Sequence, residues 1–196
     1  MPSQNVIYLV TFVTREFLFP DGRPAYPPVA ALYLASALRK AGFEPRVLHL
    51  LPEHLDQLCQ WMETERPLFV GFTTLTCSML LPSLEASGRA RELGIPVVWG
   101  GVHATILPEL CVADAADYVV IGEGDETVGE LAIAIAGEGG QESILGVVHF
   151  SKGEIKRGSR RTPVEDLEQI LPAWDLIDPS QYLDLSFPGG GMPFLL

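Results

Sequence analysis

Short apolar runs rich in β-branched residues alternate along the first 140 residues with longer segments in which apolar residues recur at helical spacing. This alternation is typical of a parallel sheet that is covered by helices on both faces. The segment at 107–116 is too short for a helix to be assigned. The pattern predicts strands at 6–13, 45–51, 68–76, 95–101 and 117–124, and helices at 27–42, 53–65, 82–94 and 127–137.

Residues of known helix-end preference mark several of these boundaries. Pro28 suits the first turn of the first helix, and Gly42 is placed to end it. Thr127 and Glu130 have the spacing of a capping box at the start of the fourth helix. Gly137 is expected to end that helix.

After Gly140 the pattern changes. Residues 144–159 read as an antiparallel hairpin that turns at 151–154, and residues 162–171 read as a helix. The predicted fold class is therefore α/β, with a doubly wound, mostly parallel, five-stranded Rossmann-like sheet. We expect the sheet domain to span residues 1–140, with residues 141–196 as a hairpin-and-helix appendage and linker.

Composition excludes several classes of function. The chain has 196 residues and a formal net charge of -12, which opposes binding to the phosphate backbone of nucleic acids. Its three cysteines form no CxxC pair, so neither a zinc site nor a disulfide framework is indicated. No apolar run is long enough for a membrane span, and the start of the chain lacks the basic residues of a signal peptide. These features favour a cytoplasmic protein, and the basic run at 156–161 is interpreted as a solvated linker.

In a doubly wound sheet the ligand binds beyond the carboxyl ends of the strands, so the loops at those ends decide the function. No phosphate-binding GxxxxGK[ST] loop is present, and no GxGxxG follows the first strand. The loop "GEGDET" carries Glu123, Asp125 and Glu126 at a helix N-terminus, where they would repel a pyrophosphate. The sequence offers no candidate catalytic residue and no candidate metal ligand.

The strand ends instead carry hydroxyl groups and glycines. Threonines and a cysteine follow the third strand, and paired glycines follow the fourth and fifth. Glycine lets a large ligand lie against the main chain, because no Cβ intervenes. Such an edge suits a bulky, mostly uncharged ligand with many hydrogen-bonding groups, although the glycines could also serve tight turns alone.

The segments "VGFTTLT", "VVWGGVHAT", "YVVIGEGDET" and "LPAWDLID", in this order and spacing, resemble the N-terminal cobalamin-binding domain of cobalamin-dependent radical S-adenosylmethionine enzymes. The resemblance covers nearly the whole chain and implies cobalamin as the bound cofactor. It places the glycine loops against the buried nucleotide tail of cobalamin, with His103 either as a ligand contact or as a local hydrogen-bonding residue. The candidate cofactor-binding residues are Thr73, Thr74, Leu75, Thr76, Cys77, Gly100, Gly101, His103, Thr105, Gly122, Glu123 and Gly124.

Two departures qualify what the resemblance implies. Residues 19–28 contain no histidine where methionine-synthase-type domains carry DxHxxG, so cobalamin is expected to bind base-off without a histidine ligand. Leu75 is the candidate residue beneath the corrin, with packing in the core as the alternative. The CxxxCxxC motif of an iron-sulfur cluster is also absent. The resemblance therefore implies that a following domain of the same polypeptide carries a 4Fe-4S cluster and S-adenosylmethionine.

The leading hypothesis is the cobalamin-binding domain of a radical S-adenosylmethionine methyltransferase, with ring formation as another reaction found among similar proteins. Two alternatives stay open, namely a stand-alone cobalamin carrier or interaction module, and a flavodoxin-like flavin protein. On the leading hypothesis a branched side chain at Gly101 would occupy ligand volume, and we expect it to harm binding far more than folding.

Overall fold

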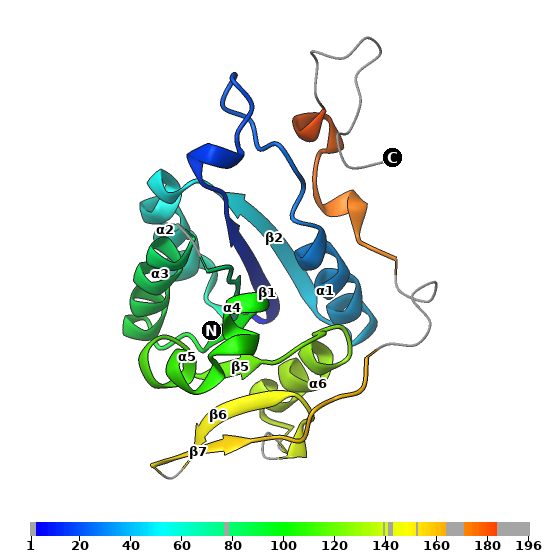
Figure 1. Ribbon diagram of the computed structural model, residues 1–196. Helices are drawn as coiled ribbons and strands as arrows, with labels where there is room; N and C mark the ends of the chain where they lie inside the picture. The colour runs from blue at the N-terminus through cyan, green and yellow to red at the C-terminus, as the bar shows by residue number, and fades with distance from the viewer. Residues whose placement is uncertain are drawn as a thin grey trace.

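The computed structural model describes residues 3–76, 79–138, 140, 143–151, 153–163 and 171–183. Its centre is a twisted sheet with strand order β2-β1-β3-β4-β5-β6-β7, and helices lie on both sides (Figure 1). The strands are β1 Ser3–Phe12, β2 Glu44–Leu50, β3 Pro67–Thr73, β4 Val97–Gly100, β5 Tyr118–Val120, β6 Val147–Ser151 and β7 Glu154–Arg157.

The first five strands are parallel, as the alternating pattern predicted. The predicted count of five strands is wrong, because the hairpin of β6 and β7 joins the sheet through an antiparallel pairing of β6 with β5. Val147 and Val148 explain this pairing, since both are buried and their side chains enter the cores on opposite faces of the sheet. A strand that is apolar on both faces is stable only inside a sheet that is covered on both sides.

One hydrophobic core lies on each face of the sheet, between the strands and the helices that cover them. The first lies between the sheet and α2, α3 and α5, and the second between the sheet and α1 and α6 (Figure 1). Consecutive residues of β3 alternate between them, with Phe69 in the second core and Val70 in the first. The helices are α1 Val29–Lys40, α2 Leu55–Glu65, α3 Leu80–Glu92, α4 Val102–Ile106, α5 Pro108–Asp114 and α6 Thr127–Ile133.

The prediction that Gly42 and Gly137 end helices is confirmed, but the prediction that Thr127 caps the fourth helix is wrong. Gly42 follows α1 with φ +90°, and Gly137 ends the π-helical turn Ala134–Glu138 that continues α6, with φ +102°. Thr127 is the first residue of α6 rather than its cap. Its hydroxyl donates to the carbonyl of Leu145 and accepts from Arg161 Nε. The helix predicted for 162–171 lies mostly outside the described residues.

Residues 171–183 lie against α1 and the loop that precedes it. The Ala173 N–H donates to the carbonyl of Leu32 in α1, and Ala173 is buried in the second core. Arg23 in the loop donates to three backbone carbonyls of residues 180–183. Tyr182 is buried, and its hydroxyl is 3.1 Å from His49 Nδ1 at the end of β2. This segment therefore fastens the edge of the sheet to α1.

His49 makes stability at this edge depend on pH. Burial lowers the pKa of His49 to about 4, and its Nε2 is buried without a partner among the described residues. The unfolded chain binds a proton near pH 6.5 and the folded chain does not, so stability falls as the pH drops from about 6.5 towards 4. At pH 5 we expect a loss of roughly 2 kcal/mol relative to pH 7.5.

Urea unfolding of the wild type and of His49→Phe at both pH values checks this expectation. Phenylalanine keeps a ring stacked on Tyr182 but cannot be protonated, so this variant should lose less stability at pH 5 than the wild type does. His54→Phe is the control, since His54 is exposed. An equal loss in the wild type and in His49→Phe would contradict a role for His49.

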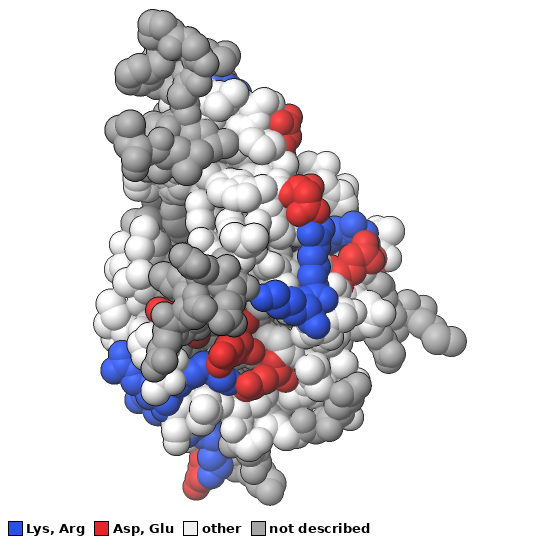
Figure 2. All heavy atoms as spheres, turned by 90° about the vertical axis from the view of Figure 1, so that its right-hand side faces the viewer, with Lys and Arg blue, Asp and Glu red and all other residues white. Residues whose placement is uncertain are grey.

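The surface does not present a field of one sign on the side that Figure 2 shows, where basic side chains lie beside acidic ones. Ion pairs explain part of this mixing, among them the two-bond pair between Arg39 and Asp175. Within the described ranges, every helix is too short or too polar to pass through a lipid bilayer.

Candidate cofactor-binding site

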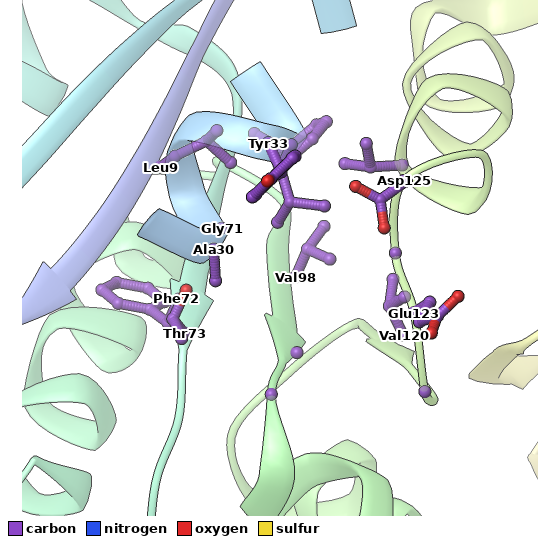
Figure 3. Close-up of a pocket in the computed structure, with 17 residues that line it drawn as sticks. Leu9, Ala30, Tyr33, Gly71, Phe72, Thr73, Val98, Val120, Glu123 and Asp125 are labelled. Atoms are coloured by element: carbon purple, nitrogen blue, oxygen red, sulfur yellow. The ribbon is translucent and has the colours of Figure 1, made fainter. Parts of the chain in front are cut away.

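A pocket of about 330 Å³ opens between α1, α6 and the carboxyl half of the sheet. In Figure 3, Leu9 and Tyr33 lie on one side of it, Glu123 and Asp125 on the other, and Val98 between them. The sequence-predicted residues that line it are Thr73, Gly100, Gly101, Gly122, Glu123 and Gly124. The further lining residues are Leu9, Ala30, Tyr33, Leu34, Phe69, Gly71, Phe72, Val98, Val120, Asp125 and Val128.

Glycines on adjacent strands clear the floor of this pocket. Parallel pairing places Gly71 of β3 between Leu9 of β1 and Val98 of β4, and it places Thr73 beside Gly100 one row nearer the carboxyl edge. Each of the two rows therefore contains one position without a side chain, Gly71 in the first and Gly100 in the second. A residue with a Cβ at either glycine would raise the floor of the pocket.

Gly100 is the clearest case of a missing side chain that leaves space. A Cβ at this position would meet nothing closer than the carbonyl oxygen of Val120 at 3.9 Å. Its φ lies outside the left-handed region that favours glycine. Neither the backbone nor a neighbouring side chain requires glycine here, so the free volume of the pocket is what the residue provides.

Gly101 has the opposite role. Its φ of +93° and ψ of -172° are accessible essentially only to glycine. A Cβ here would lie 2.7 Å from the carbonyl oxygen of Thr74 and 3.0 Å from its nitrogen. The structure thus overturns the expectation that a side chain at Gly101 would mainly occupy ligand volume, because it would collide with the β3 loop first.

The hydroxyl groups of the rim join the three loops to one another. The Thr74 hydroxyl donates to the Gly100 carbonyl at 2.8 Å, and Thr74 is buried. Thr76 Oγ1 and His103 Nδ1 are 2.9 Å apart, and Thr105 Oγ1 accepts from the Gly122 N–H at 3.0 Å.

His103 thus makes a local hydrogen bond with Thr76, and its contact with a ligand stays a prediction. Thr74, Leu75, Thr76, His103 and Thr105 do not line the pocket, and Cys77 lies outside the described residues. Leu75 is 41% exposed, so the alternative that it packs in the core is excluded.

The wall opposite α1 is formed by the loop between β5 and α6. Gly124 brings this loop close to α1, since a Cβ there would lie 2.9 Å from Leu34 Cδ2. Burial, and then the nearby carboxylates of Glu123 and Glu126, raise the pKa of Asp125. Arg161 pairs with Glu126 and Glu130 just outside the pocket. The side chains of Glu123 and Asp125 themselves line the pocket, on the side that faces Tyr33 (Figure 3).

The pocket meets three requirements of a large amide-bearing cofactor such as cobalamin. Gly100 leaves an open cradle, the walls are largely apolar, and carboxylate oxygens stand at the opening for amide N–H groups. Beside Thr73, the buried Thr11 Oγ1 at the end of β1 has no hydrogen-bond partner among the described residues. Nowhere in the described ranges do three His, Cys, Asp or Glu side chains gather as a metal site requires.

Comparisons with curated proteins find relatives that are longer than this chain. An uncharacterized methyltransferase of Pyrococcus horikoshii is 28% identical over 175 residues, which cover 86% of this chain and 37% of the relative. An anaerobic magnesium-protoporphyrin IX monomethyl ester cyclase of Cereibacter sphaeroides is 24% identical over 81% of this chain and 28% of the relative. The chain thus spans about a third of the length of the curated relatives it matches.

Solved structures show the same fold. The radical S-adenosylmethionine methyltransferase TsrM from Kitasatospora setae, with cobalamin and a [4Fe-4S] cluster bound, superposes with a TM-score of 0.67 at 23% identity, over 88% of this chain and 31% of that chain. The cobalamin-dependent radical enzyme OxsB with aqua-cobalamin bound gives a TM-score of 0.70 at 20% identity, over 88% and 24%.

A family model described as the B12 binding domain matches residues 23–132, which is more than half of the chain. The match contains α1 to α5, the strands β2 to β5 and all of α6 except Ile133, and with them every residue that lines the pocket except Leu9. The chain belongs to the B12-binding domain family.

Proposed function

We propose that this chain binds cobalamin at the carboxyl edge of its sheet, with the nucleotide tail in the pocket and the corrin ring above the rim. The open cradle at Gly100 is the observation that carries the proposal, since neither backbone conformation nor packing accounts for that glycine. When bound, cobalamin would supply a cobalt ion that can accept and donate a methyl group. The chain itself provides the apolar cavity and the acceptors at its opening.

We propose further that the cofactor is held base-off and without a histidine ligand. A tail that enters the pocket cannot at the same time coordinate cobalt through its base. The loop before α1, at residues 19–28, contains no histidine that could replace the base. His49 and His103 are engaged elsewhere, with Tyr182 and with Thr76.

Titration of the purified chain with hydroxocobalamin tests this function. We expect retention of the corrinoid through gel filtration and an absorption spectrum of the base-off type. A parallel titration with flavin mononucleotide tests the alternative that the chain binds a flavin. A chain that retains no corrinoid and leaves its spectrum unchanged would refute the proposal.

Leu75 is the proposed residue beneath cobalt. It follows β3 at the edge where the corrin would lie, and it is 41% exposed. An apolar side chain there would exclude water from the lower face, which favours the lower oxidation states of cobalt.

Leu75→His is expected to convert the spectrum of the bound corrinoid to that of a nitrogen-ligated cobalamin. Leu84→His, at a comparably exposed leucine of α3, is the control and should keep the wild-type spectrum. If Leu75→His binds cobalamin with an unchanged spectrum, then Leu75 does not lie under cobalt.

For the parent protein, we propose a cobalamin-dependent radical S-adenosylmethionine enzyme that transfers methyl groups. In it, residues 1–140 form the cofactor-binding unit, and residues 141–196 lead towards a domain with a 4Fe-4S cluster and S-adenosylmethionine. Two relatives are named methyltransferases, and this supports methyl transfer. Ring formation is the second candidate, because another relative is a cyclase. A CxxxCxxC motif encoded downstream of residue 196 would support the enzyme, and a stop codon would support the stand-alone carrier.

A further inference from the structure

The polarity of the pocket changes with depth. Its outer row on the sheet contains Thr73 and Gly100. The next row inward contains Leu9, Gly71 and Val98, and Phe69 lies two residues before Gly71 on the same face of β3. Carboxylates stand only at the opening, on the loop between β5 and α6. Among the described lining residues, the inner rows therefore carry apolar side chains or none.

The backbone does not supply hydrogen bonds at this depth either. The inner rows belong to β1, β3 and β4, whose N–H and C=O groups are paired within the sheet. On the facing side, Leu34 of α1 and Val128 of α6 are apolar. Tyr33 carries the one hydroxyl among the described lining residues of α1, and it remains partly exposed.

We propose that this pocket makes the chain selective for cobamides whose lower base is a benzimidazole, such as dimethylbenzimidazole, and that it rejects the more polar purine bases. The inference rests on the proposed function, since it requires the nucleotide tail to enter the pocket. Benzimidazole and purine rings are similar in shape, so polarity must separate them. In the base-off form both bases leave one imidazole nitrogen unbound, and adenine would in addition bury an exocyclic amine and two further ring nitrogens against groups that cannot bond them.

An unsatisfied buried polar group of this kind weakens binding by about 10- to 100-fold. Inner rows without hydrogen-bonding side chains discriminate in this way, because the polar base must lose its water there and gains no hydrogen bond in return. In solution, dimethylbenzimidazole holds cobalt more strongly than adenine does. Cobalamin therefore loses more binding free energy when its base leaves cobalt. The measured preference for cobalamin over the adenine cobamide is for this reason smaller than the discrimination by the pocket itself.

The test compares three corrinoids on the full 196-residue chain by absorption titration. They are cobalamin, the adenine-containing cobamide, and cobinamide, which lacks the nucleotide tail. We expect cobalamin to bind more tightly than the adenine cobamide, by up to about 100-fold, and more tightly than cobinamide.

Two variants address the inner row directly. A Cβ at Gly71 would lie 3.2 Å from Leu9 Cδ2 and 3.5 Å from Phe69 Cε2, so Gly71→Ala should weaken cobalamin but not cobinamide. Retained cobinamide binding shows that the variant is folded, and Gly88→Ala on α3, with open space around it, is the matched control. Val98→Thr adds a hydroxyl at constant shape, and it should narrow the preference for cobalamin over the adenine cobamide.

The outcomes separate this inference from the function on which it rests. If all three corrinoids bind equally, or if the adenine cobamide binds best, the selectivity is overturned while corrinoid binding stands. If cobalamin and cobinamide bind equally, the tail does not use the pocket, and the inference fails. If no corrinoid binds, the proposed function fails, and this inference fails with it.

Discussion

Replacing Gly100 by leucine is expected to weaken cobalamin binding by about 100-fold or more while the protein stays folded. The side chain would extend into the pocket, since a Cβ at Gly100 has no neighbour closer than 3.9 Å. The backbone conformation at this position is open to any residue. Spectral titration measures the loss of binding, and thermal unfolding of the apoprotein shows whether the fold is retained.

The matched control for this substitution is Gly88→Leu. Gly88 is exposed on α3, and a side chain there meets nothing within 4 Å. This control adds the same side chain outside the pocket, so it should bind cobalamin like the wild type. If Gly100→Leu binds cobalamin normally, the nucleotide tail does not occupy this pocket, and the proposed placement of the cofactor is wrong.

Local signals in the sequence were sufficient to predict the order and type of most elements. Gly42 and Gly137 end their helices with a positive φ. Glycine adopts this conformation more easily than any other residue, so the residue type alone indicates the helix end. The segment at 107–116 could not be assigned, because it contains only the seven-residue helix α5, and the five-residue helix α4 before it was not predicted at all. Each of them is too short to give a periodic pattern.

The hairpin shows where local signals end. Its turn was predicted correctly, but its pairing with β5 depends on residues far apart in the sequence, such as Val148 and Val119. Arg161 shows the same limit. In the sequence it belongs to a basic run that was interpreted as solvated, yet its side chain is only 12% exposed, because it pairs with Glu126 and Glu130.

The pocket was predicted at its rim and missed in its interior. The rim residues follow the strands, where a rule about parallel sheets directs attention. Residues such as Leu9, Leu34 and Val98 look like ordinary core residues, and only strand register and helix packing show that they border a cavity. One signal was present, since Gly71 interrupts an apolar strand, and an interior glycine often marks a close approach to a ligand.

The rim hydroxyls show why residue type alone does not define a contact. Thr74 and Thr105 have the chemistry expected of ligand-binding residues, and both use it to hold neighbouring loops. The loops from β3, β4 and β5 are thereby joined before any ligand arrives. A rim that is fixed in this way loses little conformational entropy on binding, which favours affinity.

The second large effect is expected at the neighbouring glycine, where Gly101→Val should destabilise the fold by roughly 3–5 kcal/mol. Part of the loss is backbone strain, because valine is forced to a φ of +93°. The rest is the collision of its Cβ with the Thr74 carbonyl at 2.7 Å, and this backbone group is held by a hydrogen bond from the His103 N–H. Urea unfolding of the apoprotein measures the change.

Gly100→Ala is the control for this second prediction, since the adjacent position accepts a methyl group without contact and should lose less than about 1 kcal/mol. Substitutions at these two neighbouring glycines are therefore expected to have different effects. A large side chain at Gly100 should weaken cobalamin binding, whereas one at Gly101 should lower the stability of the fold. If Gly101→Val keeps its unfolding free energy and loses only cobalamin, then the β3 loop moves aside, and the glycine serves the cofactor rather than the close approach to Thr74.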